Sequence, residues 1–168
     1  MFAKGDLIIY GSTGVCRVLE VGPMQGGTGA DADRLYYTLT PVYSTGTIYI
    51  PVDTKVFMRP IIDRQQAQEL ITRIPQIRED LCCSKDPKIL AERYQASLLT
   101  HQCEDLVQLI KSIYAKNHTA GRKPGNTDQQ YMKRAQELLR GELAAALEIP
   151  IEDVESYISK AVASLPQK

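Results

Sequence analysis

The segment Asp6-Leu-Ile-Ile-Tyr10-Gly-Ser-Thr-Gly14-Val-Cys-Arg-Val-Leu-Glu-Val21 decides the fold of the first third of the chain. A β-rich apolar run from Asp6 to Tyr10 ends in the turn cluster Gly11–Gly14, and an alternating run follows from Val15 to Val21. This order predicts two strands joined by a tight turn. Both faces of the second run hold apolar side chains, as expected where a small barrel is covered on one side.

Three more short runs extend this pattern. Strands are predicted over Arg34–Thr40, Gly46–Pro51 and Val56–Arg59, and the glycine-rich stretch from Gly22 to Gly29 is predicted to be a hairpin loop. Pro51 has no amide hydrogen and therefore belongs at a strand end or a sheet edge. Five strands at this spacing predict a small SH3-like or Tudor-like β-barrel over residues 1–60.

The rest of the chain shows helical spacing. Asp63 is a cap for a helix to about Ile74, and residues 61–86 are read as this helix and a connector. Over residues 87–168, four helices are predicted: Lys88 to about Leu99 behind Asp86-Pro87, Cys103 to about Asn117, one from a Thr127/Gln130 capping box to about Leu143, and one after Pro150. The fold class is therefore α+β, a five-stranded barrel followed by an all-α bundle.

Composition excludes several classes of protein. No apolar run reaches the ~18 residues of a membrane span, and the first residues lack a secretory signal, so we expect a cytoplasmic protein. The four cysteines form no C-x-x-C pair, and the histidines are not at zinc-finger spacing, so no metal and no cofactor is expected. His101 and Cys103 lie close in sequence without a recognisable orienting acid, and we expect no enzymatic activity.

Short motifs occur in a fixed order along both halves of the chain. They are Phe2-x-x-Gly5-Asp6-x-Ile8-Ile9-Tyr10, Gly14-Val15-x-x-Val18, Tyr49-Ile50-Pro51, Arg93-Tyr94 and Ala135-x-x-Leu138-x-x-Gly141-Glu142-Leu143. In this order they resemble the CarD family of bacterial RNA polymerase-binding transcription factors. The resemblance covers nearly the whole chain and includes a barrel that the family shares with transcription-repair coupling factors.

The resemblance implies a two-part transcription regulator. The barrel would dock on the lobe of the polymerase β subunit, partly by pairing a strand edge, and the candidate contacts are Arg34, Tyr37, Tyr49 and Ile50. The bundle would meet promoter DNA at the upstream edge of the open bubble and modulate open-complex stability. In relatives a tryptophan on the first bundle helix enters the minor groove, and alignment on Arg93-Tyr94 puts Leu90 at that position.

Charge is distributed unevenly although the formal net charge is zero. Residues 85–140 carry ten basic and six acidic side chains, and the candidate phosphate contacts there are Lys88, Arg93, Arg122, Lys123, Lys133 and Arg134. This modest excess predicts weak DNA binding by the isolated protein, with attachment to the polymerase raising the local concentration.

Two departures from the family pattern leave a second reading open. The chain has no tryptophan, and Glu92 stands where relatives often carry a basic residue. Leucine offers less apolar area than an indole, although apolar wedges occur in minor-groove proteins. The alternative is therefore a polymerase-binding adaptor without direct DNA contact. In both readings a monomer is expected.

Overall fold

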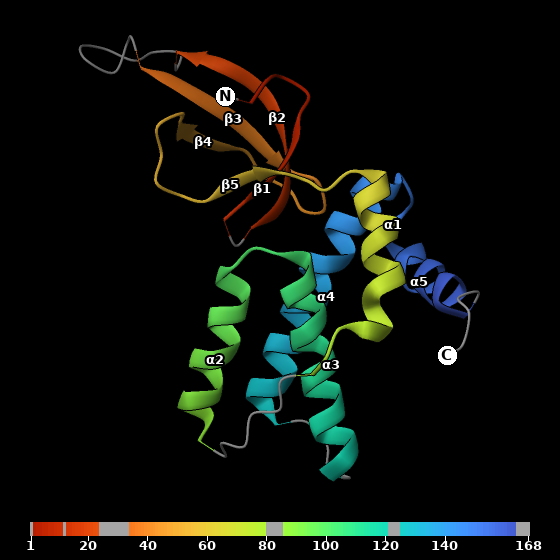
Figure 1. Cartoon of the computed structure of the whole chain (residues 1–168). Coiled ribbons are helices and arrows are strands. Elements are labelled where there is room, and N and C mark those ends of the chain that lie inside the picture. Colours follow the sequence, from red (N-terminus) through yellow and green to blue (C-terminus); the bar gives the residue numbers. More distant parts are fainter. Residues whose placement is uncertain (1, 12, 24–33, 80–85, 121–124, 164–168) are drawn as a thin grey trace. The chain divides into compact units, whose positions relative to one another are not determined.

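The computed structural model describes residues 2–11, 13–23, 34–79, 86–120 and 125–163 (Figure 1). The chain divides into two compact units, Met1–Ile61 and Ile62–Lys168. The first unit holds the strands and the second the helices. The predicted hairpin loop, Cys82, Cys83, Arg122 and Lys123 lie wholly or mostly outside the described residues.

The first unit is a five-stranded antiparallel sheet. Its strands are β1 Leu7–Tyr10, β2 Gly14–Pro23, β3 Leu35–Pro41, β4 Ile48–Pro51 and β5 Met58–Pro60, and their spatial order is β4-β3-β2-β1-β5. All five predicted strands are present. The predicted closed barrel is not confirmed, because β4 and β5 lie at opposite edges and no pairing joins them among the described strands.

One face of the sheet forms its own core. The buried side chains alternate along the strands: Ile8, Cys16, Val18, Tyr37, Leu39 and Ile50. Phe2 covers this cluster, with its ring centroid 5.9 Å from that of Tyr37, and its amide donates to the Tyr37 hydroxyl at 3.1 Å. The turn from β1 to β2 depends on glycine, because Gly11 and Gly14 have φ angles of 46° and 98°.

The second unit contains five α-helices. They are α1 Arg64–Arg73, α2 Pro87–Leu99, α3 Cys103–Ala120, α4 Asn126–Leu147 and α5 Val154–Ala163, with the short 3-10 turns η2 Ile74–Gln76 and η3 Ile151–Asp153. The starts of α1 and α2 confirm the predicted caps. Asp63 and Gln66 form a complete capping box, and the Asp86 side chain accepts from the Lys88 amide at 2.9 Å.

The start of α4 differs from the prediction. The helix begins at Asn126 behind Gly125 and has no side-chain cap, so the predicted Thr127/Gln130 capping box is wrong. The helix also runs one turn beyond Leu143, to Leu147, and ends where Glu148 adopts a left-handed conformation with φ 57°. The run from Leu143 to Leu147 contains only leucine and alanine. Both are strong helix formers, which favours this extension.

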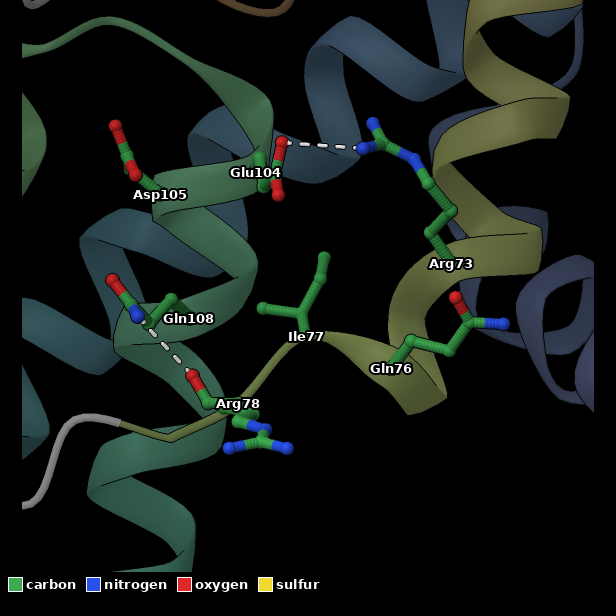
Figure 2. A pocket seen from close by; sticks show the side chains of 7 residues that line it. All are labelled: Arg73, Gln76, Ile77, Arg78, Glu104, Asp105 and Gln108. Atoms are coloured by element: carbon green, nitrogen blue, oxygen red, sulfur yellow. Dashed lines mark hydrogen bonds and ion pairs between the residues drawn. The ribbon is translucent and has the colours of Figure 1, made fainter.

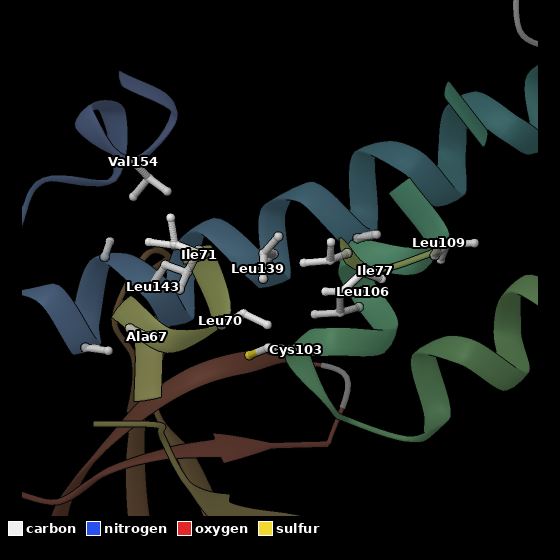
Figure 3. Close-up of a cluster of buried hydrophobic side chains, with 14 of the residues drawn as sticks. Ala67, Leu70, Ile71, Ile77, Cys103, Leu106, Leu109, Leu139, Leu143 and Val154 are labelled. Carbon is white, nitrogen blue, oxygen red and sulfur yellow. The ribbon is translucent and has the colours of Figure 1, made fainter. Parts of the chain in front are cut away.

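The bundle core is built from one stripe of each helix (Figure 3). Ala67, Leu70 and Ile71 come from α1, and they lie among buried side chains of α3 and α4. Val154 closes the cluster from α5. Full burial of one such aliphatic side chain contributes about 1.5–3 kcal/mol, so this cluster is the main stabilising feature of the second unit.

Candidate functional surfaces

Strand β4 forms one edge of the sheet, and its hydrogen-bonding pattern can be assigned. The Val52 amide donates to the Leu35 carbonyl at 3.1 Å, so this pair is a hydrogen-bonded pair of the antiparallel ladder. Such pairs alternate with non-bonded pairs, which makes Ile50, opposite Tyr37, a bonded position. The amide and carbonyl of Tyr49 therefore point away from β3, in the direction from which another strand could pair.

The four predicted polymerase contacts fall into two groups. Tyr49 is 59% exposed, and Arg34 is also exposed. Tyr37 and Ile50 are buried in the sheet core. Their side chains pack in the core and stabilise the pairing of β3 with β4. Of the four candidates, Tyr49 and Arg34 are the ones whose side chains a partner could contact.

Arg34 joins the first residues of β3 to the chain that follows β4. Its guanidinium contacts Asp53 at 3.0 Å and lies 6.0 Å from the centre of the Tyr36 ring. The hydrogen bond from Arg34 holds the pKa of the Asp53 carboxyl below its usual range. This pair places one positive and one negative group beside the open edge.

The opposite edge, at β5, offers less to a partner strand. The Gly11 amide donates to the Phe57 carbonyl, so this is a hydrogen-bonded pair of the ladder between β1 and β5. Bonded and non-bonded pairs alternate, and the backbone groups of Met58 and Pro60 therefore point away from β1. Pro60 has no amide hydrogen, and its carbonyl already accepts from Arg59 at 3.0 Å. Proline and an occupied carbonyl are typical protection of an edge strand. Of the two edges, β4 is therefore the better template for strand addition.

Helix α2 presents Ile89, and not Leu90, to solvent. Leu90 is only 6% exposed and packs in the bundle core, whereas Ile89 is 46% exposed. Leu90 shares its face with Tyr94, one turn later, which is buried as well. The Leu90 side chain could reach DNA only by leaving the core, and in this structure the apolar side chain at the outer surface of that turn is Ile89.

The described basic candidates lie on two helices that pack together, α2 and α4. Lys88 and Arg93 are exposed on α2 beside Ile89, and Glu92 is exposed on the same helix. On α4, Lys133 is exposed and Arg134 pairs with Glu137 at 3.7 Å. The phosphate contacts of these four residues stay predictions.

A buried carboxylate that the sequence analysis did not single out joins α2, α3 and α4. Asp128 accepts from the Tyr94 hydroxyl at 2.8 Å and from the Asn117 amide at 3.2 Å, and the Lys116 ammonium lies 3.3 Å away. Tyr94 of the Arg93-Tyr94 motif therefore has a structural role. The sequence contained a sign that Asp128 is buried, because this residue falls on the apolar side of its helix, three residues before Tyr131.

The described residues also form a small polar cleft between the end of α1 and the start of α3 (Figure 2). Its volume is about 290 Å³. Arg73 pairs with Glu104 at 3.4 Å, and the Gln108 side chain donates to the Arg78 carbonyl at 3.2 Å. Side chains of both charges line it, so its electrostatics favour neither anions nor cations.

In the part of the chain that the structure describes, no cluster of histidine, cysteine and carboxylate side chains is arranged to hold a metal ion. Among the same residues, no helix has the length and apolar character required to cross a membrane.

Comparison with known families bears on the sheet unit. Residues 2–62 match the family model described as CarD-like/TRCF RID domain. The sheet unit is similar to a CarD-like RID domain. The match ends within one residue of the boundary between the two compact units, and it confirms the resemblance over these residues. No curated protein matches the chain. The RID domain supports a transcription-related protein that interacts with RNA polymerase.

Proposed function

We propose that the chain is a transcription regulator that docks on the lobe of the polymerase β subunit through the β4 edge of its RID domain. Its helical unit then contacts upstream promoter DNA at the edge of the bubble and modulates the stability of the open complex. The observation that carries the proposal is the RID match over residues 2–62 together with the outward backbone groups of Tyr49 on the less protected edge. The proposed protein is a cytoplasmic bacterial monomer that performs no catalytic step.

Strand addition at β4 would use few backbone bonds. One outward residue supplies one donor and one acceptor, and each hydrogen bond contributes about 0.5–1.5 kcal/mol. Most of the affinity must therefore come from side chains. Exposed Tyr49 supplies a large amphipathic surface, and the Arg34–Asp53 pair supplies charge beside it.

DNA contact is proposed for the outer surface of α2. Ile89 is an exposed apolar side chain with Lys88 and Arg93 beside it, which suits an apolar contact flanked by phosphate contacts. Burial of an isoleucine gives about 1.5–3 kcal/mol, which is similar to the cost of unstacking one base step. The contact would be weak alone and would depend on the high local concentration that polymerase docking provides.

The polymerase contact is tested with a matched pair of proline variants. Tyr49→Pro removes an outward amide at β4, and Met58→Pro removes an outward amide at β5. Binding to the isolated β lobe is measured by titration, and circular dichroism checks the fold of both variants. We expect Tyr49→Pro to weaken binding at least about tenfold and Met58→Pro to change it little. Equal affinities of the two folded variants would refute docking at β4.

The adaptor without DNA contact remains the second candidate. It is favoured by the zero net charge, by exposed Glu92 beside Ile89 and by the pairing of Arg134 with Glu137. Salt titration of promoter binding by the polymerase complex separates the two functions. The regulator predicts a steeper salt dependence when the chain is present, reduced in Lys88→Ala/Arg93→Ala, because each phosphate contact adds about one unit to the slope. The adaptor predicts no added slope.

A further inference from the structure

Two neighbouring amides at the boundary between the units are held by different parts of the chain. The Ile61 amide donates to the Leu7 carbonyl of β1 at 3.2 Å, within the RID domain. The next amide, that of Ile62, donates to the Glu142 carboxylate of α4 at 2.9 Å, within the helical unit. The backbone is therefore hydrogen-bonded to the sheet unit at Ile61 and to the helical unit at Ile62. No residue lies between these two hydrogen-bonded positions.

Glu142 is an unusual anchor because it is a carboxylate inside the bundle core. It is only 1% exposed. Its Oε2 accepts from Ile62, and its Oε1 lies 3.0 Å from the Sγ of Cys103, the first residue of α3. Burying a carboxylate is costly unless donors satisfy its oxygens, and here each oxygen has at least one donor. The same side chain thus joins the start of the helical unit to α3 and α4.

The residues that follow Ile62 are held as well. The Asp63 amide donates to the Gln66 side chain at 2.9 Å in the capping box of α1. The Arg64 guanidinium donates to the Leu147 carbonyl at the end of α4 at 3.0 Å. The chain is therefore fixed to the bundle from its first residue, and Glu142 provides the first of these bonds.

We propose that Glu142 is a positioning residue that limits the connection between the two units to the single peptide link between Ile61 and Ile62. Without this carboxylate, the anchored part of the helical unit begins one residue later, at the Asp63 capping box, and the tether lengthens. The same change frees the Cys103 thiol from its acceptor. This inference depends on the hydrogen bonds within each unit and not on what either unit binds.

The test is amide hydrogen exchange in the full chain, measured residue by residue by NMR. Glu142→Leu removes both acceptor oxygens. We expect exchange of the Ile62 amide to accelerate at least about tenfold, because a hydrogen bond to a charged acceptor is lost. The Ile61 amide, bonded to Leu7, and the Ala67 amide, bonded to Asp63 within α1, keep their protection.

The matched control is Asp128→Leu, which removes another buried carboxylate from the same helix but does not touch the boundary. It is expected to leave exchange at Ile62 relative to Ala67 unchanged. If Glu142→Leu loses its helical circular dichroism, Glu142→Gln decides by the same ratio with an expected change of about threefold, because an amide keeps one acceptor oxygen but loses the charge. An Ile62-to-Ala67 ratio equal to that of the Asp128 control would overturn the proposal.

Discussion

Two adjacent side chains on α2, Leu90 and Ile89, are expected to respond in opposite ways to truncation. Leu90→Ala leaves a cavity in the bundle core and should lower the free energy of unfolding by about 2–5 kcal/mol. Ile89→Ala removes an exposed side chain and should change it by less than about 0.5 kcal/mol. Urea unfolding followed by circular dichroism measures both. A larger loss for Ile89→Ala would contradict the orientation of the helix described above.

The Cys16 thiol is expected to give the RID domain a characteristic alkaline instability. Burial raises its pKa from 9.0 to about 11, so the folded state binds this proton more tightly than the unfolded state. The resulting stabilisation is complete below pH 9 and is lost as the pH rises through 11.

Cys16→Val removes this titration with little change in volume. The difference in melting temperature between wild type and variant should therefore shift in favour of the variant between pH 9 and 11. Tyr43, whose pKa burial also raises, titrates in both proteins and cancels in the comparison. The pKa of Tyr10 is raised by burial and by the charge of Cys16, so the part due to Cys16 is lost in the variant together with the thiol. A pH-independent difference would show that Cys16 does not contribute.

The orientation of α2 could have been predicted from its own spacing. Leu90, Tyr94 and Leu98 recur every four residues, which marks one face, and Ile89 lies off that face. Packing in the core is the more common role of a leucine on an amphipathic helix, and only the resemblance at Arg93-Tyr94 favoured a DNA contact for Leu90. The burial of Tyr37 and Ile50 could have been predicted in the same way from the two-residue period of a strand. Each is next to a more exposed residue, Thr38 or Tyr49, that lies on the other face.

At the scale of elements, the hydroxyl of Tyr94 should hold α2 to α4. Tyr94→Phe keeps the ring but removes the donor at 2.8 Å from Asp128, which leaves a buried carboxylate with one hydrogen bond fewer. We expect a loss of about 1–3 kcal/mol in the free energy of unfolding. Tyr131→Phe is the control, because the Tyr131 ring contacts Tyr94 but its hydroxyl is not part of the Asp128 network. Equal effects of the two variants would argue against the network.

Elements whose signals are local could be predicted, and those that need distant partners could not. The turn glycines and the caps at Asp63 and Asp86 act within a few residues, and the strands and helices near them were placed correctly. Whether β4 and β5 close a barrel depends on pairing between strands that lie far apart in the sheet, and no local pattern encodes that pairing. The Glu142–Ile62 bond spans 80 residues and leaves no sequence signal.

For the whole molecule, the division into two units has an energetic basis. Among the residues that the structure describes, the buried cluster of the sheet is built from residues up to Met58, and that of the bundle from residues from Ile62 onward. The larger cluster belongs to the bundle, and small domains bury a smaller fraction of their surface. The two units should therefore differ in their ability to fold alone.

We expect the fragment Ile62–Lys168 to fold independently, because its core lies within it and its buried Asp128 and Glu142 have hydrogen-bond donors within it. Its amide spectrum should overlay that of the full chain for α3 and α4, with differences confined to the first residues of the fragment. The fragment Met1–Ile61 relies on a much smaller cluster, which at about 60 residues gives marginal stability, and should melt at a lower temperature than the helical fragment. A helical fragment without dispersed amide signals would mean that its core needs the RID domain, and the connection at Ile61–Ile62 would then be part of one folding unit and not a tether between two.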